Sequence, residues 1–197
     1  MTSGSGKPKL AILISGRGSN MLAIARACES GELNAQIALV LSNRRDAAGI
    51  SAADALGIST DVIEHTAFTS RDDFDSSLRA RLELVDPDWI VLAGFMRILG
   101  KDFVQRWKGR ILNIHPSLLP AYPGLNTHER AIKAGDKEAG ASVHLVTPEL
   151  DAGPVVEQVR VPVLPTDTPE TLAQRVIEQE HILYVNALKQ CVNIARP

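Results

Sequence analysis

Short apolar runs alternate along most of this chain with segments in which apolar residues recur every three or four positions. The first run, LAILI at 10–14, is followed by a glycine turn and then by helical spacing from Asn20 to Ser30. The same reading predicts strands at 10–14, 37–41, 60–63, 89–93, 111–115, 142–146 and 155–161, and helices at 20–30, 47–56, 70–85, 100–109, 127–134 and 168–188. Alternation of this kind is typical of an α/β fold with a mainly parallel sheet. The last two strands are expected to form a hairpin.

The composition fits one compact globular domain. The chain has 197 residues, of which 45% are hydrophobic and 22% are charged, and a chain of this length buries enough surface to fold without disulfides or metals. We expect residues 1–8 to be a flexible lead-in and residues 9–197 to form a single domain. Two cysteines favour a reduced, cytoplasmic protein over a disulfide scaffold.

Charge and apolar run length argue against two classes of partner. The 21 Lys and Arg residues are balanced by 23 Asp and Glu, and only 4% of residues are aromatic, so a nucleic-acid-binding protein is disfavoured. The longest strongly apolar stretch, 89–96, is far shorter than the roughly 20 residues of a membrane helix. No membrane span is expected.

The glycine turn at 15–20, SGRGSN, lies between a predicted strand and a predicted helix. Backbone N–H groups at a helix start bind anions, and glycine lets a ligand approach the backbone. A dinucleotide fingerprint needs a small residue at position 21, which is Met, and an acid about 20 residues beyond the turn, where 41–44 reads LSNR. The turn therefore favours a terminal phosphate. Arg44 and Arg45 keep an NADP site open, and a turn without a ligand is the remaining alternative.

The second candidate site is the end of the strand at 111–115. Asn113 and His115 are two residues apart, so their side chains lie on the same face near the edge where open α/β sheets bind ligands. An amide that donates to a developing oxyanion, beside an imidazole that exchanges protons, suits acyl transfer. Asp151, in a polar turn, is a candidate for orienting His115. The alternatives are a structural histidine and an aspartate that only begins its turn.

Other polar residues carry weaker signals. Ser117 follows no G-x-S-x-G motif, which argues against a serine hydrolase. We expect His65 to be a solvated loop residue, and His128 and His144 to be candidates for the same cleft as His115. Their spacing matches no zinc pattern, so no metal site is expected. The plain reading of Glu178, Glu180 and His181 is a mixed polar helix surface.

Four segments together resemble a known family. They are GRGSN at 16–20, AGFMRIL at 93–99, NIHPSLLPAYPG at 113–124 and ELDAGP at 149–154. In this order they resemble the phosphoribosylglycinamide formyltransferases of the monofunctional bacterial type, within the folate formyltransferase superfamily. The likeness extends from about residue 9 to residue 189. LNTHERA departs from the family at Asn126, where a histidine or aspartate is common.

The resemblance implies a fold, an activity and a set of site residues. The fold is a Rossmann-like three-layer domain with a mostly parallel seven-stranded sheet. The activity is transfer of a formyl group from the co-substrate 10-formyltetrahydrofolate to glycinamide ribonucleotide in purine biosynthesis, without a metal. The implied catalytic residues are Asn113, His115 and Asp151. Those implied for the ribonucleotide are Gly18, Ser19, Asn20, Ile177, Glu178, Gln179 and Glu180. Those implied for the folate are Arg71, Met96, Arg97, Ile98, Leu99, Asn113, Thr147, Pro148, Glu149, Leu150 and Asp151.

Three alternatives remain open beside this activity. A formyltetrahydrofolate hydrolase shares the Asn-His-Asp trio, an NADP-dependent reductase would use Arg44 and Arg45, and a nucleotide-phosphate-binding module would need no catalysis. The expected partners are small-molecule substrates, with neither nucleic acid nor membrane, and the expected state is a monomer or a homodimer.

Overall fold

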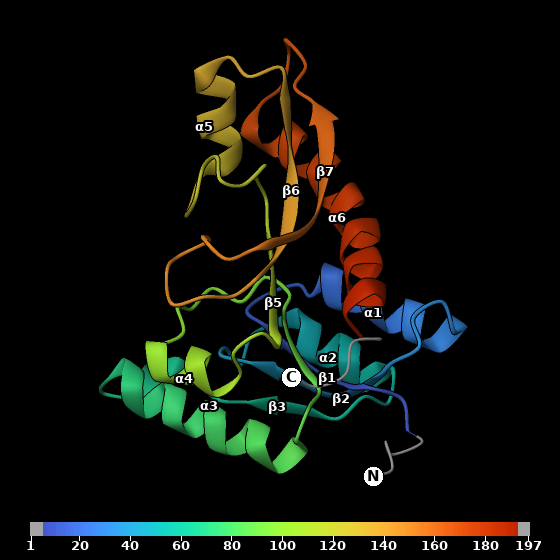
Figure 1. The fold of residues 1–197 in the computed structure, drawn as a ribbon, viewed down its shortest axis with the longest axis vertical. Coiled ribbons are helices and arrows are strands. Elements are labelled where there is room, and N and C mark those ends of the chain that lie inside the picture. Colours follow the sequence, from blue (N-terminus) through green and yellow to red (C-terminus); the bar gives the residue numbers. More distant parts are fainter. Residues whose placement is uncertain (1–5, 193–197) are drawn as a thin grey trace. The chain divides into compact units, whose positions relative to one another are not determined.

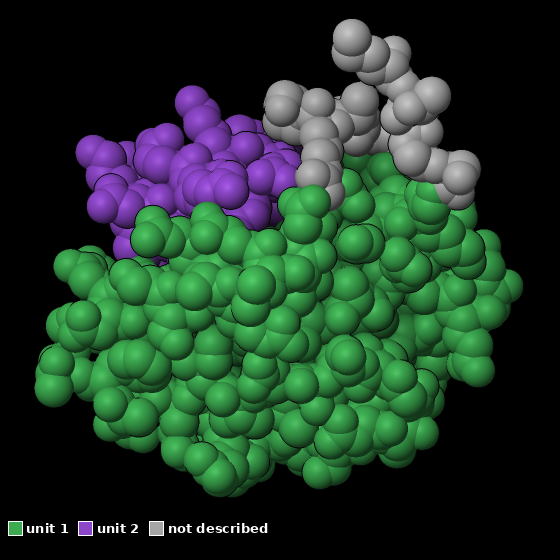
Figure 2. All heavy atoms as spheres, turned by 90° about the horizontal axis from the view of Figure 1, so that it is seen from below, with its two compact units in different colours: residues 1–96, 188–197 green, residues 97–187 purple. Residues whose placement is uncertain are grey.

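The computed structural model of the protein describes residues 6–192, and the chain divides into two compact units (Figure 2). Unit 1 contains the residues up to 96 together with those from 188 onward, and unit 2 contains residues 97–187. Residues 1–5 of the expected lead-in and the last five residues of the expected domain lie outside the described part. A single domain over 9–197 stays a prediction.

Unit 1 contains four strands in the order β3-β2-β1-β4, and every neighbouring pair is parallel. Figure 1 labels β1, β2 and β3. The strands are β1 (Lys9–Ile14), β2 (Gln36–Ser42), β3 (Thr60–Val62) and β4 (Trp89–Leu92). Residues 10–14 have no exposed surface, and β4 is buried throughout. Burial on both faces of a parallel sheet explains why these strands are unbroken apolar runs.

The helices of unit 1 follow the signals in the sequence. They are α1 (Ser19–Ser30), α2 (Ala48–Ala55) and α3 (Arg71–Val85), with a short 3-10 helix, η1 (His65–Ala67), that the sequence did not predict. The Ser70 side chain caps α3 by accepting from the Asp73 N–H at 3.1 Å. Phe74, Leu78 and Leu82 are buried along one face of α3, as their spacing predicted.

Unit 2 contains three antiparallel strands in the order β5-β6-β7. They are β5 (Ile111–His115), β6 (Glu138–Leu145) and β7 (Val155–Pro162), so the expected hairpin is confirmed. β6 begins four residues before the predicted start at 142. Gly140 lies so close to β7 that a Cβ there would be 1.9 Å from the Val159 carbonyl oxygen. Pairing with β7 therefore makes residues 138–141 part of β6, although their residue types are weak strand formers.

The remaining helices are α4 (Lys101–Arg106), α5 (Thr127–Ala134) and α6 (Pro169–Val192). Thr168 caps α6, since its hydroxyl accepts from the Thr171 N–H at 3.3 Å, and Pro169 is the first helical residue, as predicted. α6 continues to Val192, beyond the predicted end at 188. In the part of the chain that the structure describes, no helix is long and apolar enough to cross a membrane.

Candidate active site

The glycine turn of unit 1 joins β1 to α1 as the sequence predicted. Gly18 precedes the helix with φ +74°, a left-handed conformation that glycine adopts without steric cost. The helix begins at Ser19, and its first intrahelical bond runs from the Leu22 N–H to the Gly18 carbonyl at 2.9 Å. The first amides of a helix have no intrahelical acceptor, so residues 18–20 present the groups that an anion requires.

Gly49, in α2, supports this turn from behind. Its N–H donates to the Gly16 carbonyl at 3.0 Å. A Cβ on Gly18 would lie 3.0 Å from the Gly49 Cα, and a Cβ on Gly49 would lie 2.5 Å from the Ile14 Cδ1. The sequence reading missed Gly49, because nothing in its neighbourhood along the chain shows that two glycine backbones touch.

A buried hydroxyl network begins at Ser15, the residue after β1. The Ser15 Oγ donates to the Asn43 Oδ1 at 2.6 Å and accepts from the Met96 N–H at 2.7 Å. His65 Nδ1 lies 2.9 Å from the Asn43 carbonyl oxygen, and the residue is half-buried in η1. The expectation of a solvated loop histidine is therefore wrong. His65 contacts the residue that follows β2, and the sequence alone does not reveal this contact.

The arginines that kept the NADP alternative open have carboxylate partners. The Arg44 guanidinium donates to both oxygens of Asp46, at 2.9 and 2.7 Å, and Arg45 lies 3.6 Å from Glu64. The Asp46 carboxylate raises the pKa of Arg44 further above its ordinary value. Because the Arg44 guanidinium already donates to both oxygens of a carboxylate, it is poorly suited to bind a 2′-phosphate.

The residues implied for folate binding differ in exposure. Arg71, the first residue of α3, is exposed. Met96 is 65% and Ile98 is 59% exposed, and Arg97 is exposed too, whereas Leu99 is buried.

In unit 2, β5 and β6 place Asn113 opposite His144 and His115 opposite Ser142. The Asn113 Nδ2 lies 3.1 Å from the His144 Nε2, and the His144 Nδ1 lies 3.0 Å from the Leu145 carbonyl oxygen. A carbonyl only accepts, so the His144 Nδ1 carries the proton and its Nε2 accepts from Asn113. Burial lowers the pKa of His144, which favours this neutral ring.

This pairing orients the Asn113 carboxamide. One N–H of the carboxamide donates to His144, and the same NH₂ group has a second N–H donor. The sequence reading named His144 only as a candidate for the same cleft. The cross-strand register gives it a definite contact with Asn113.

His115 is buried and lies between two acceptors. Its Nε2 donates to the Tyr122 carbonyl at 2.9 Å, and its Nδ1 lies 3.4 Å from the Asp151 Oδ2. When the ring carries two protons, each N–H therefore has an acceptor. The structure brings His115 and Asp151 together as the sequence hypothesis required.

Asp151 is fixed by the turn that follows β6. Its φ is +51°, and its carboxylate accepts from the Gly124 N–H at 2.9 Å. The carboxylate also lies 3.7 Å from the His144 Nε2. Two residues on, a Cβ at Gly153 would lie 1.8 Å from the Leu145 carbonyl oxygen, so the turn has its shape because position 153 is glycine. Asp151 therefore does more than begin a turn.

The preceding residues of this segment lie at the surface. Thr147 is half-buried, and its hydroxyl donates to the Glu149 carbonyl at 3.2 Å. Pro148, Glu149 and Leu150 are exposed.

The four residues implied on α6 divide between surface and interior. Glu178 is exposed and accepts from the Gln174 amide at 3.4 Å, and Ile177 and Gln179 are half-buried. Glu180 is only 8% exposed, so the reading of this segment as plain surface is wrong for Glu180. One turn later, the Tyr184 hydroxyl donates to the Leu112 carbonyl at 3.0 Å, which shows that this face of α6 packs on β5.

Metal ligation has no support in residues 6–192, where no group of three or more His, Cys, Asp or Glu side chains is arranged to hold an ion. His65, His115 and His144 instead contact carbonyl, amide and carboxylate groups. That the activity requires no metal stays a prediction.

The sequence of this chain is similar to those of known proteins. The formyl transferase family model matches residues 8–188. The chain is 48% identical over 175 residues to the phosphoribosylglycinamide formyltransferase of Escherichia coli (strain K12), covering 89% of this chain and 82% of that protein.

Two solved structures of enzymes with the same name share the fold of this chain. The phosphoribosylglycinamide formyltransferase of Coxiella burnetii matches with a TM-score of 0.88 and 52% identity, over 93% of this chain and 86% of the other. The enzyme of that name from Brucella melitensis matches with a TM-score of 0.90 and 47% identity, over 94% and 96% of the two chains. These likenesses confirm the α/β, Rossmann-like fold class with its seven-stranded, mostly parallel sheet. The chain therefore belongs to the formyl transferase family.

Proposed function

We propose that the protein transfers the formyl group of 10-formyltetrahydrofolate to the amine of glycinamide ribonucleotide. The products are formylglycinamide ribonucleotide and tetrahydrofolate, a step of de novo purine biosynthesis. The observation that carries the proposal is the cluster of Asn113, His115 and Asp151 at the end of β5, with one Asn113 N–H held by His144. The activity named for the relatives from E. coli, C. burnetii and B. melitensis supports the choice of substrates.

In the proposed reaction the primary amine attacks the formyl carbon directly, and the carbonyl oxygen becomes an oxyanion. The second Asn113 N–H donates to that oxygen, and protonated His115 adds positive charge beside it. The attacking nitrogen must lose a proton, and N10 of the folate must gain one as the carbon–nitrogen bond breaks. His115 is the group that moves this proton. No covalent enzyme intermediate is required.

Asp151 supports His115 in this scheme. Its carboxylate faces the Nδ1 of His115 at 3.4 Å and is itself held by the Gly124 N–H. A fixed negative charge at this distance stabilises the imidazolium while the oxyanion is present. In the described conformation the His115 Nε2 donates to the Tyr122 carbonyl. This hydrogen bond to the Tyr122 carbonyl must break before the His115 Nε2 can exchange a proton with a substrate.

The ribonucleotide is assigned to two groups of residues. The phosphate binds the amides of Gly18, Ser19 and Asn20, where a helix start and a glycine backbone favour an anion. Residues 177–180 of α6 bind the sugar. Glu180, which is buried in α6, is assigned to the ribonucleotide with them.

The folate is assigned to Arg71, residues 96–99, Asn113 and residues 147–151. Arg71 is the first residue of α3, and its positive charge there is repelled by the positive end of the helix dipole. A ligand carboxylate at this position would be attracted both by the guanidinium and by the helix start. The exposed Met96 and Ile98 supply the apolar contacts for a pterin.

In this proposal the protein acts on small molecules in the cytoplasm and needs no resident metal. Its proposed state is a monomer or a homodimer. Its test is the absorbance change on mixing the purified protein with 10-formyltetrahydrofolate and glycinamide ribonucleotide. His115→Ala and a reaction without the amine are run in parallel. We expect turnover that requires the amine and that falls by about 10²–10⁴ in the variant.

Other results would point elsewhere. Formate release without the amine would identify a formyltetrahydrofolate hydrolase. No turnover by a folded protein that binds NADPH tightly would identify a reductase. Full activity in His115→Ala would exclude the proposed acid–base group.

A further inference from the structure

The loop at 116–122 leaves β5 at His115 and returns to the same histidine. It begins directly after His115, the last residue of β5, and the Tyr122 carbonyl at its far end accepts from the His115 Nε2 at 2.9 Å. The orientation of the imidazole therefore depends on the path of this loop. A residue that fixes the loop also fixes His115.

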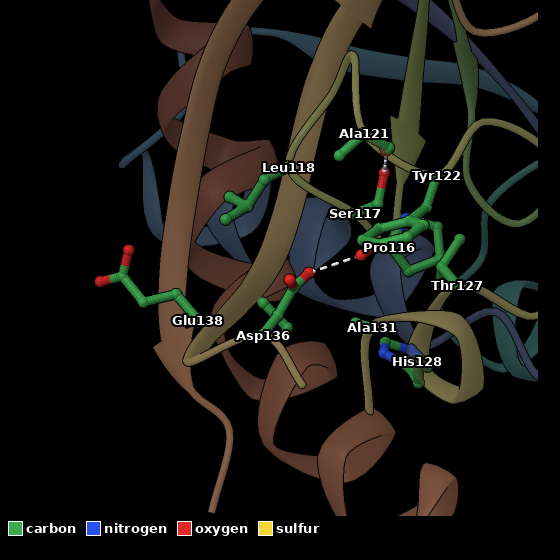
Figure 3. A pocket seen from close by; sticks show the side chains of 11 residues that line it. Pro116, Ser117, Leu118, Ala121, Tyr122, Thr127, His128, Ala131, Asp136 and Glu138 are labelled. Atoms are coloured by element: carbon green, nitrogen blue, oxygen red, sulfur yellow. Dashed lines mark hydrogen bonds between the residues drawn. The ribbon is translucent and has the colours of Figure 1, made fainter. Parts of the chain in front are cut away.

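Part of the path is set by bonds within the loop. The Ala121 N–H donates to the Leu118 carbonyl at 3.0 Å, and the Ser117 hydroxyl donates to the Ala121 carbonyl at 2.6 Å. Figure 3 shows the second bond as a dashed line between the Ser117 side chain and Ala121. These two bonds shape the loop, and other residues must attach it to the sheet.

The attachment comes from a row of side chains that crosses the three strands of unit 2. His115 of β5 lies opposite Ser142 of β6, and Ser142 lies opposite Gln158 of β7. Directly opposed residues of antiparallel strands have their side chains on the same face of the sheet. Ser142 and Gln158 therefore lie on the face that carries the imidazole.

Ser142 binds the first half of the loop. Its hydroxyl donates to the Ser117 carbonyl at 2.6 Å and accepts from the Leu119 N–H at 3.0 Å. Ser117, Leu119 and Ser142 are all buried. Loss of either bond would therefore leave a buried polar group without its partner, which is costly.

Gln158 completes the attachment from the outer strand. Its Nε2 donates to the Leu119 carbonyl and to the Ser142 hydroxyl, both at 2.8 Å. The hydroxyl has a single proton, which goes to the Ser117 carbonyl, so Gln158 and the Leu119 N–H occupy its lone pairs. Gln158 thus holds Leu119 directly and also fixes the direction in which Ser142 donates.

We propose that Gln158 is a positioning residue for the formyl transfer. It holds Leu119 and aligns the Ser142 hydroxyl, and it thereby fixes the loop whose Tyr122 carbonyl orients His115. The inference rests on the proposed function, because it assigns Gln158 to the reaction in which His115 moves the proton. Gln158 acts through the loop and not by contact with a substrate.

The expected effect is on kcat rather than on KM. A misplacement of about 1 Å in a reacting group costs up to roughly 10²-fold in rate, whereas the residues assigned to the two substrates lie outside the loop. Gln158→Met keeps an unbranched side chain of similar length and removes the amide donor. We expect kcat to fall roughly tenfold and the KM for each substrate to change by less than about twofold.

The matched control is Arg160→Met, two residues further along β7 and on the same face. The Arg160 guanidinium donates to the Glu138 carboxylate at 2.8 Å, so this substitution also removes a side-chain bond between β6 and β7. It leaves the bonds to the loop in place. We expect kcat and both KM values to equal those of the parent.

A double-mutant cycle separates positioning from general loosening of the structure. If Gln158 acts through His115, Gln158→Met lowers kcat only where the imidazole is present. In a His115→Ala background its effect is expected to be less than about twofold. An equal loss in both backgrounds, or a parent kcat in Gln158→Met, would overturn the proposal.

Two further measurements complete the test. The ring NMR signals of His115 in the isotope-labelled full chain report its Nε2 hydrogen bond without any turnover, and we expect them to shift in Gln158→Met but not in Arg160→Met. An inactive parent would overturn the proposed function, whereas unmoved His115 signals in Gln158→Met would overturn the link from Gln158 to His115. If Gln158→Met does not fold, Gln158→Glu decides, because its carboxylate cannot donate to the Leu119 carbonyl. A parent kcat in Gln158→Glu would then overturn the proposal.

Discussion

Replacing Gly49 by alanine tests whether the glycine turn depends on the close approach of two backbones. The added Cβ would lie 2.5 Å from the Ile14 Cδ1 and 3.1 Å from both the Gly16 carbonyl oxygen and the Gly18 Cα. Ile14 has no exposed surface, so its side chain has no solvent to rotate into. The Ile14 Cδ1 is the end of a flexible side chain that can shift, but the two 3.1 Å contacts are with backbone atoms, so the turn must also give by a few tenths of an ångström.

The expected cost follows from these distances. Forcing one methyl group into a packed interior costs about 1–3 kcal/mol of unfolding free energy. The displaced turn carries the amides assigned to the phosphate, and a hydrogen bond to a charged group contributes about 1.5–3 kcal/mol. Loss of one such bond raises the KM for the ribonucleotide by roughly 10–100-fold.

Steady-state kinetics and urea unfolding measure the two effects separately. Gly57→Ala is the matched control, because its φ of +69° strains an alanine while its Cβ would meet no atom within 4 Å. It should lose roughly 1 kcal/mol of stability without a change in KM. The reasoning is refuted if Gly49→Ala keeps the parent KM for the ribonucleotide, or if Gly57→Ala raises it equally.

Three further changes have expected outcomes. Asn113→Ala should lower kcat by about 10²–10³ in the formyl transfer assay, since it removes an oxyanion donor, and a kcat within threefold of the parent would contradict this role. Gly153→Ala should lower the unfolding free energy by about 3 kcal/mol in urea, because its Cβ would meet the Leu145 carbonyl at 1.8 Å, and an unchanged midpoint would exclude that clash. Stability should fall as the pH drops below the ordinary histidine pKa of 6.5, because the pKa of buried His144 is lowered and the unfolded chain binds a proton that the folded chain does not. Urea unfolding at several pH values should show a weaker dependence for His144→Gln, and an equal dependence would refute the assignment.

The fold followed from the sequence where local pattern and burial agree. The apolar runs of β1 and β4 and the helical spacing of α3 needed no tertiary information, because a buried strand and an amphipathic helix each leave their own periodicity. The start of β6 and the helix η1 did not follow. Pairing with β7 and the contact of His65 with Asn43 determine these elements, and both partners are distant in sequence.

The candidate site divides in the same way. The sequence alone determined that Asn113 and His115 share a strand face and that a glycine turn precedes α1, because both are consequences of spacing within one element. Only the tertiary structure decided that His144 holds Asn113, that Asp151 faces His115, that Gly49 touches Gly18, and that Glu180 is buried. These contacts join residues from different elements, and their register and packing are set by the folded core rather than by local sequence.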